Sequence, residues 1–153
     1  MQTIQRKKFE KIEIRPQYIT DYKKFSQHLI KKGKKYTVEN IFKQGVLHWM
    51  KHLDSLEFED VLKKAFVCVK PGVGLKTKRK GSKNIYIPYR LTTRRSEYLS
   101  SNWMLTSALS RNKRKLSEKI VEELVETSLK KSSSNKKYEE MFKLAEESLI
   151  NVR

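Results

Sequence analysis

Hydrophobic residues recur along most of the chain at the three- and four-residue spacing that is typical of amphipathic helices. The pattern predicts six helices, whose apolar stripes together are large enough to line one shared core. The predicted helices cover about residues 21–32, 37–53, 55–69, 94–110, 117–129 and 138–149. The fourth of these has no single clean stripe, which indicates that it is buried on more than one side.

Local signals mark where these helices begin and end. Gly33 is placed to follow the first helix in a left-handed conformation, and Asn112 is placed to do the same after the fourth. Thr37 and Ser117 are the expected N-caps of the second and fifth helices. The run of serines at 132–134 is expected to be a short linker.

One stretch has the two-residue period of a strand instead. Apolar residues alternate with polar or small ones from Val73 to Thr77 and again from Ile85 to Leu91. This alternation predicts a half-buried β-hairpin at about residues 73–91, whose base, including Tyr89, packs on the helices. The predicted fold is therefore mainly α, a six-helix domain with a protruding two-stranded β-hairpin.

The 153 residues carry a formal net charge of +18, and this charge is unevenly distributed. Residues 61–117 hold 15 basic residues and 1 acidic residue, whereas residues 118–153 hold 7 and 8. A surface that serves only solubility intersperses both signs, so this segregation favours a nucleic-acid partner. No apolar run approaches the roughly 18 residues of a membrane span, and the densest charge lies on the hairpin and loops rather than on an amphipathic helix.

The basic residues gather at four places, and structured RNA, recognised by its shape, is the favoured ligand. Outside the N-terminal region the candidate phosphate contacts are Lys34, Lys35, Lys76, Lys78, Arg79, Lys80, Lys83, Arg94, Arg95, Arg111, Lys113, Arg114 and Lys115. The cationic tip of the hairpin, at 78–83, is expected to have no fixed shape until RNA binds.

The N-terminal region is predicted to be a basic arm at 1–19, which precedes a single helical domain at 20–153. Its candidate RNA contacts are Arg6, Lys7, Lys8 and Arg15. Two interpretations stay open for this arm. It is either an extended segment that orders on RNA or an unstructured terminus without a ligand.

The sequence contains no motif for catalysis or for cofactor binding. It has no phosphate-binding glycine loop and no dinucleotide-binding motif. His48 and His52 lie four residues apart on a predicted helix, but no third ligand is arranged to complete a metal site. We therefore predict neither an enzyme nor a metal or cofactor site. Helix-turn-helix recognition of DNA is the more serious rival, although it would place the charge on a recognition helix.

Short matches to a known family follow one another in order along residues 10–150. They are Lys24-Phe25, Gly33-Lys34-Lys35, Val69-Lys70-Pro71, Arg79, Gly81, Pro88, Arg94-Arg95, Trp103-Met104, Leu116-Ser117-Glu118-Lys119-Ile120 and Leu144-Ala145-Glu146. With this series the chain resembles the universal ribosomal small-subunit protein seven family, in its bacterial and organellar form. It departs from the family at Ser82, Thr92 and Asn112, where glycine, proline and glycine are usual.

The resemblance implies a helical domain with a protruding β-ribbon, in agreement with the pattern of the residues. It also implies a primary rRNA-binding protein, which binds the 3′ major domain of the small-subunit rRNA and organises the head. The implied surroundings are the exit-site tRNA, the mRNA path and small-subunit proteins nine, eleven and thirteen, and the residues themselves predict no membrane partner. The alternative is a free-standing basic RNA- or DNA-binding module outside the ribosome.

The use of lysine and alanine bears on the origin of the chain. Only 3 alanines stand against 26 lysines, which indicates an AT-rich genome of the kind found in many organelles. We therefore expect a mitochondrial ribosomal protein located in the matrix. A plastid or a bacterial cytoplasm is the alternative location.

Overall fold

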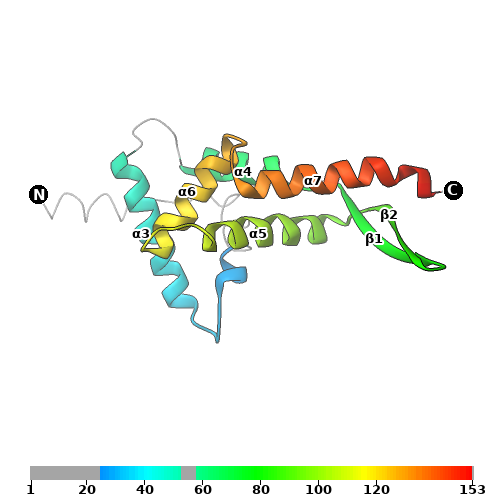
Figure 1. Ribbon diagram of the computed structural model, residues 1–153. Helices are drawn as coiled ribbons and strands as arrows, with labels where there is room; N and C mark the ends of the chain where they lie inside the picture. Colours follow the sequence, from blue (N-terminus) through cyan, green and yellow to red (C-terminus); the bar gives the residue numbers. More distant parts are fainter. Residues whose placement is uncertain (1–24, 53–57, 153) are drawn as a thin grey trace, which may run out of the picture.

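The computed structural model describes residues 25–52 and 58–152. Residues 25–29 form a short helical stretch. The elements that follow are α3 (Lys35–His52), α4 (Phe58–Val69), β1 (Val73–Lys80), β2 (Lys83–Arg90), α5 (Thr93–Leu109), α6 (Leu116–Ser128), α7 (Ser133–Glu147) and the 3₁₀ helix η1 (Ser148–Val152). The prediction of a mainly helical domain with a protruding two-stranded hairpin is confirmed (Figure 1).

The helices share one hydrophobic core. Its fully buried members are Phe25, Val38, Phe42, Leu62, Ala65, Met104, Leu105, Ala108, Ile120 and Leu124. At one side of it the ring of Phe25 meets the rings of Phe42 and Phe66 edge to face, with centroids 5.6 and 5.7 Å apart. Apolar residues from α3, α4, α5 and α6 therefore meet in one place, as their periodic spacing predicts.

Helix α5 is buried along more than one side, as its lack of a clean stripe predicts. Small polar side chains make this possible, because Ser100, Ser101 and Ser107 are all buried. The hydroxyls of Ser100 and Ser101 both donate to the carbonyl oxygen of Glu97, over 3.0 and 2.8 Å. A serine that bonds back to its own helix takes little space and leaves its hydroxyl satisfied, so neighbouring helices approach α5 closely.

The hairpin continues directly from the end of α4 and is fixed at its base. The hydroxyl of Ser96 on α5 donates to the carbonyl oxygen of Pro71 over 2.5 Å, and the amide of Leu91 donates to the carbonyl oxygen of Gly72 over 3.0 Å. Gly74 is buried because the side chain of Leu91 occupies the space where a Cβ atom would point. These contacts fix the root of the hairpin against α5.

The two strands pair in antiparallel register from Val73↔Arg90 to Lys80↔Lys83. Gly81, at the tip, has a φ of +62°, the left-handed conformation that tight two-residue hairpin loops require. The expectation that the tip has no fixed shape before RNA binds is therefore wrong for this structure, because the ladder continues to the last residue of each strand. In Figure 1 the hairpin extends away from the core, and α7 with η1 runs toward the same end.

The prediction that Tyr89 packs on the helices with the rest of the hairpin base is also wrong. Its side chain is 45% exposed, whereas Val73, Leu75 and Ile87 at the same end are half-buried. The register explains this, because Tyr89 lies opposite Gly74 and its ring covers that glycine from the outside. The ring therefore buries one edge and leaves the rest open to solvent.

Three predicted helix ends differ from the structure. Helix α3 begins at Lys35, before the expected cap at Thr37, and α6 begins at Leu116, which leaves Ser117 buried inside the helix. Asn112 is not among the described residues with a left-handed backbone, although Gly33 is. The amides of Ser110 and Arg111 bond to the last carbonyls of α5 instead, so no left-handed residue is needed there.

The serine run at 132–134 is not a linker, because α6 and α7 are joined by a tight turn. Lys130 has a φ of +58° and the amide of Lys131 bonds back to the carbonyl oxygen of Glu126, which ends α6 in a Schellman-type turn. Ser132 follows at once as the N-cap of α7 and accepts a hydrogen bond from the amide of Asn135 over 3.3 Å.

Within residues 25–52 and 58–152, none of the helices has the length and apolar character needed to cross a membrane.

Gly45 marks the place where α3 crosses the start of α6. A Cβ atom on Gly45 would lie 2.8 Å from Cγ2 of Val121 and 3.2 Å from the carbonyl oxygen of Ser117. Gly45→Ala should therefore lower the free energy of unfolding by about 1–3 kcal/mol, the usual cost of overpacking. In an open helix position the same change would stabilise by up to about 1 kcal/mol.

Urea denaturation followed by circular dichroism measures this effect. Gln44→Ala is the control, because Gln44 is exposed on the same helix, and it should change the free energy by no more than about 0.5 kcal/mol. A Gly45→Ala protein that is more stable than the parent would contradict the close approach.

Candidate nucleic-acid interface

The outer part of the hairpin is lined with exposed cations. Lys76, Lys78 and Lys80 share one face of β1, because alternate residues of a strand point to the same side, and Arg79 points to the other. Lys80 lies directly opposite Lys83 on β2. Like charges in directly opposed positions destabilise a strand pair, and a phosphate bound between them would remove that repulsion.

The other face of the hairpin combines an aromatic ring with a cation. Tyr86 lies opposite Thr77 in the register and diagonal to Arg79, and its side chain is 47% exposed. An exposed ring on the same face as a cation offers a stacking surface for an unpaired base. This face can therefore contact a nucleic acid in a different way from the lysine face.

Two arginines lie in the first turn of α5, next to the hairpin root. Arg94 and Arg95 are exposed, and the guanidinium carbon of Arg95 lies 5.0 Å from the centroid of the Tyr98 ring. The first turn of α5 holds no acid. The positive end of the helix dipole and the two arginines together favour an anion at this position.

A second group of cations lies in the loop that joins α5 to α6. Lys113, Arg114 and Lys115 are exposed there. Lys113 is 3.5 Å from a carboxylate oxygen of Glu122, and Lys115 is 3.9 Å from one of Glu118. Exposed pairs of this kind are weak and exchange easily for another anion, so both lysines remain available for phosphate.

The remaining predicted contacts fall at the start of α3 and in the N-terminal region. Lys34 and Lys35 are exposed, and Lys35 lies 3.9 Å from Glu39 one turn along the helix. The arm residues Arg6, Lys7, Lys8 and Arg15 lie outside the described residues, so their part in binding stays a prediction.

The hairpin and the α5–α6 loop lie at opposite ends of α5 (Figure 1). With 17 residues, α5 is about 25 Å long at the usual rise per residue. The cations therefore do not converge on one pocket. Apart from Lys34 and Lys35, they form two clusters at the two ends of a helix that runs through the core, and such an arrangement suits contact with two separate segments of a large nucleic acid.

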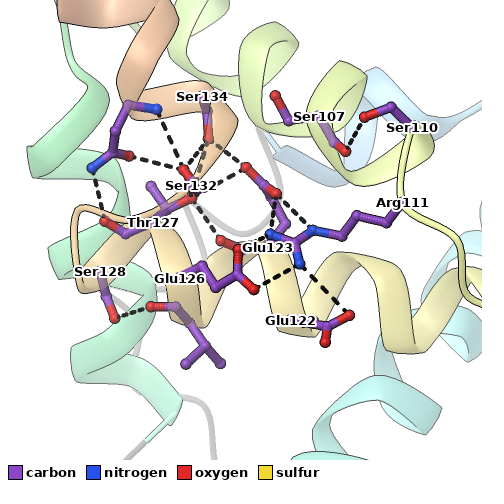
Figure 2. A network of polar contacts seen from close by, with 12 residues as sticks. Ser107, Ser110, Arg111, Glu122, Glu123, Glu126, Thr127, Ser128, Ser132 and Ser134 are labelled. Carbon is purple, nitrogen blue, oxygen red and sulfur yellow. Dashed lines mark hydrogen bonds and ion pairs between the residues drawn. The ribbon is translucent and has the colours of Figure 1, made fainter.

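Arg111 differs from the other predicted contacts, because its guanidinium points inward onto α6 (Figure 2). Its Nε donates to Glu123 over 2.8 Å, and Nη2 lies 2.6 Å from the same carboxylate. Nη1 and Nη2 also donate to the two carboxylate oxygens of Glu126. Glu122 is a third carboxylate, 3.6 Å from Nη1. All three guanidinium nitrogens are thus engaged within the protein, and only 17% of the side chain is exposed.

The carboxylate of Glu123 extends this cluster into a buried polar network. Only 1% of Glu123 is exposed. Its second oxygen accepts hydrogen bonds from the hydroxyls of Ser134, over 2.5 Å, and Thr127, over 3.5 Å. The hydroxyl oxygens of Ser132 and Ser134 form a hydrogen bond over 2.7 Å at the start of α7. The network therefore connects the α5–α6 loop to α6 and to the first turn of α7.

Arg111 and Glu126 hold each other ionised. The hydrogen bond from Arg111 is the main cause that lowers the pKa of Glu126, and the bond to Glu126 in turn raises the pKa of Arg111. A lowered carboxylate pKa contributes stability above the ordinary value of 4.5, and this contribution is lost as the pH falls through the pKa of the folded state. The pair is therefore intact at neutral pH.

Among the described residues, no group of three or more histidine, cysteine or acidic side chains is arranged to hold a metal ion.

Glu123 is the member of the network that sequence reasoning missed. Its signal is an acid between Ile120 and Leu124 on the apolar side of a predicted helix, a place that requires a buried cation as partner.

Comparison with known proteins shows the family of the chain. The family model described as "Ribosomal protein S7p/S5e" matches residues 3–148. The "Small ribosomal subunit protein uS7" of a Nitratiruptor species is 29% identical, over 80% of this chain and 79% of that protein. The "Small ribosomal subunit protein uS7c" of Ostreococcus tauri is 30% identical, over 78% of this chain and 76% of its own length. The chain therefore belongs to the ribosomal protein S7p/S5e family, as the short matches along its sequence predict.

Proposed function

We propose that this protein is an rRNA-binding structural constituent of the small ribosomal subunit, and that it acts by position and charge rather than by catalysis. The observation that carries the proposal is the pair of cation clusters at the two ends of α5. A rigid helix between them allows the protein to hold two rRNA segments at a fixed separation. Because phosphate contacts fix register and orientation, this is an architectural role.

The hairpin cluster comprises Lys76, Lys78, Arg79, Lys80 and Lys83, with Arg94 and Arg95 at its root. The loop cluster comprises Lys113, Arg114 and Lys115. Lys34 and Lys35 and the arm at 1–19, ahead of a single domain at 20–153, add further contacts. We assign these residues to rRNA phosphates because they are exposed or lie in the basic arm, and because backbone contact with structured RNA needs no particular base sequence.

The family resemblance supports a finer placement. We propose that the bound rRNA is the 3′ major domain, and that the protein helps to organise the head near the exit-site tRNA and the mRNA path. Its neighbours there would be small-subunit proteins nine, eleven and thirteen. The lysine-rich, alanine-poor composition favours a mitochondrial ribosome, with a plastid or bacterial ribosome as the alternative.

Binding to defined RNAs tests the proposal. The full chain is titrated with a transcript of the 3′ major domain of the small-subunit rRNA, and with a structured RNA of equal length and unrelated sequence. At about 150 mM salt we expect the rRNA transcript to bind at least about tenfold more tightly. Equal affinity for both RNAs would favour the free-standing nucleic-acid-binding module, which would also be absent from the small-subunit peak when a lysate is sedimented.

A further inference from the structure

Arg111 sits in a run of cations, but its surroundings are anionic. Three carboxylates surround its guanidinium, those of Glu122, Glu123 and Glu126. Lys113 is the second cation at this cluster, 3.5 Å from Glu122. These carboxylates already engage all three guanidinium nitrogens, so a phosphate at Arg111 would have to displace one of them. A direct contact between Arg111 and RNA is therefore disfavoured.

The loop that carries the neighbouring cations has little regular structure of its own. Residues 112–114 are neither helix nor strand. At its start, the backbone amide of Arg111 donates to the carbonyl oxygen of Ala108 over 3.2 Å. The Arg111 side chain then fixes the loop to α6 through Glu123 and Glu126. Lys113 and Lys115 add weaker, exposed ion pairs with Glu122 and Glu118, so Arg111 provides the most extensive side-chain contact between the loop and α6.

The same contact also connects this loop, through α7, to the hairpin at the other end of the molecule. Glu123 accepts from Ser134 in the first turn of α7. Helix α7 continues into η1, where the side-chain amide of Asn151 donates to the carbonyl oxygen of Tyr86 on β2 over 3.3 Å. The path from Arg111 through Glu123, Ser134 and α7 therefore reaches the hairpin (Figures 1 and 2).

We propose that Arg111 is a positioning residue rather than an RNA contact, and that its bonds to Glu123 and Glu126 hold the cationic loop at a set distance from the hairpin. The proposal rests on the function proposed above, because its consequence for RNA is the correct spacing of two phosphate-binding clusters. Loss of the bonds should reduce binding to an RNA that must meet both clusters at once, and leave binding to any other RNA unchanged.

Glu126→Gln is the sharpest test, because a purely electrostatic role and a positioning role predict opposite changes in RNA affinity. The variant removes one negative charge, so a purely electrostatic surface would bind RNA more tightly. Under the proposal the variant weakens the bonds from Arg111 to residue 126 and leaves those to Glu123. It should then bind the 3′ major domain transcript about tenfold more weakly, an effect of the size seen between contacting residues of one network. Glu140→Gln makes the same change of charge at an exposed position of α7 and should not weaken binding.

Arg111→Lys is the second variant. It keeps the charge but cannot form the paired bonds to two carboxylates. The proposal expects weaker binding to the transcript, although no charge is lost. If Arg111→Lys binds like the parent, while Arg111→Gln lowers the slope of log K against log salt by about 0.7–0.9, Arg111 is a phosphate contact and the proposal is overturned.

Amide hydrogen exchange separates this inference from the proposed function. In the protein without RNA, exchange at residues 112–115 should be faster in Glu126→Gln and Arg111→Lys than in the parent and in Glu140→Gln. Unchanged exchange at the loop overturns the positioning role whatever the RNA results are. If exchange is faster in these variants but the parent protein does not distinguish the two RNAs, the positioning role of Arg111 is supported and the proposed function is rejected instead.

Discussion

Replacing Arg111 by alanine is expected to lower the free energy of unfolding by about 3–5 kcal/mol, the usual cost of removing one partner of a buried ion pair. The reason is Glu123, whose side chain is almost fully buried. Without the guanidinium, its carboxylate keeps only the hydroxyls of Ser134 and Thr127 as partners. A buried charge that has lost its cationic partner costs stability. Urea denaturation of the full chain, followed by circular dichroism, measures the loss.

Two further variants decide whether the buried charge is the cause. Lys113→Ala removes an exposed cation of the same loop and should cost no more than about 1 kcal/mol. The double variant Arg111→Met with Glu123→Gln removes both charges, and the glutamine oxygen still accepts a hydrogen bond from Ser134. It should therefore recover part of the stability that Arg111→Ala loses. An Arg111→Ala protein within about 1 kcal/mol of the parent would show that Glu123 does not depend on Arg111.

The fold follows from local patterns because most elements bury one face at a time. The stripes on α4 and α6 and the alternation in β1 and β2 each specify an element without knowledge of its partner. Even the absence of a clean stripe on α5 is informative, since it predicts burial on several sides. The exposed cations of the hairpin follow from the same reasoning, because a charged strand cannot lie in a core.

The role of Arg111 does not follow from local patterns. In the sequence it looks like Lys113 and Arg114, which share its loop. What separates them is the return of α6 beside the loop, which brings Glu123 and Glu126 to the guanidinium from 12 and 15 residues away. The position of Tyr89 depends in the same way on a partner, the glycine that the strand register places opposite to it. Both outcomes depend on packing between distant segments, and the periodic spacing of residues along the sequence does not encode that packing.

The tip of the hairpin should dominate the salt dependence of RNA binding. Changing Lys78, Arg79 and Lys80 together to alanine is expected to reduce the slope of log K against log salt by about two to three units, because each phosphate contact releases roughly 0.7–0.9 counterions. All three side chains are exposed, so the free energy of unfolding should not fall. It should rise slightly if the repulsion between Lys80 and Lys83 contributes to the parent protein. Fluorescence anisotropy with the 3′ major domain transcript at several salt concentrations gives the slope.

A matched triple variant separates contact at the tip from a general loss of positive charge. Lys131, Lys136 and Lys143 are exposed along α7 and the turn before it and belong to neither cation cluster, and their replacement by alanine changes the net charge by the same amount. A general effect of net charge would weaken binding equally in both triples. Contact at the hairpin instead predicts a large change of slope in the first triple and little in the second, because at about 150 mM salt a charge acts over only about 8 Å. Equal changes, or an unchanged slope in the hairpin variant, would mean that the tip does not touch phosphate and that the loop cluster and the arm carry the binding.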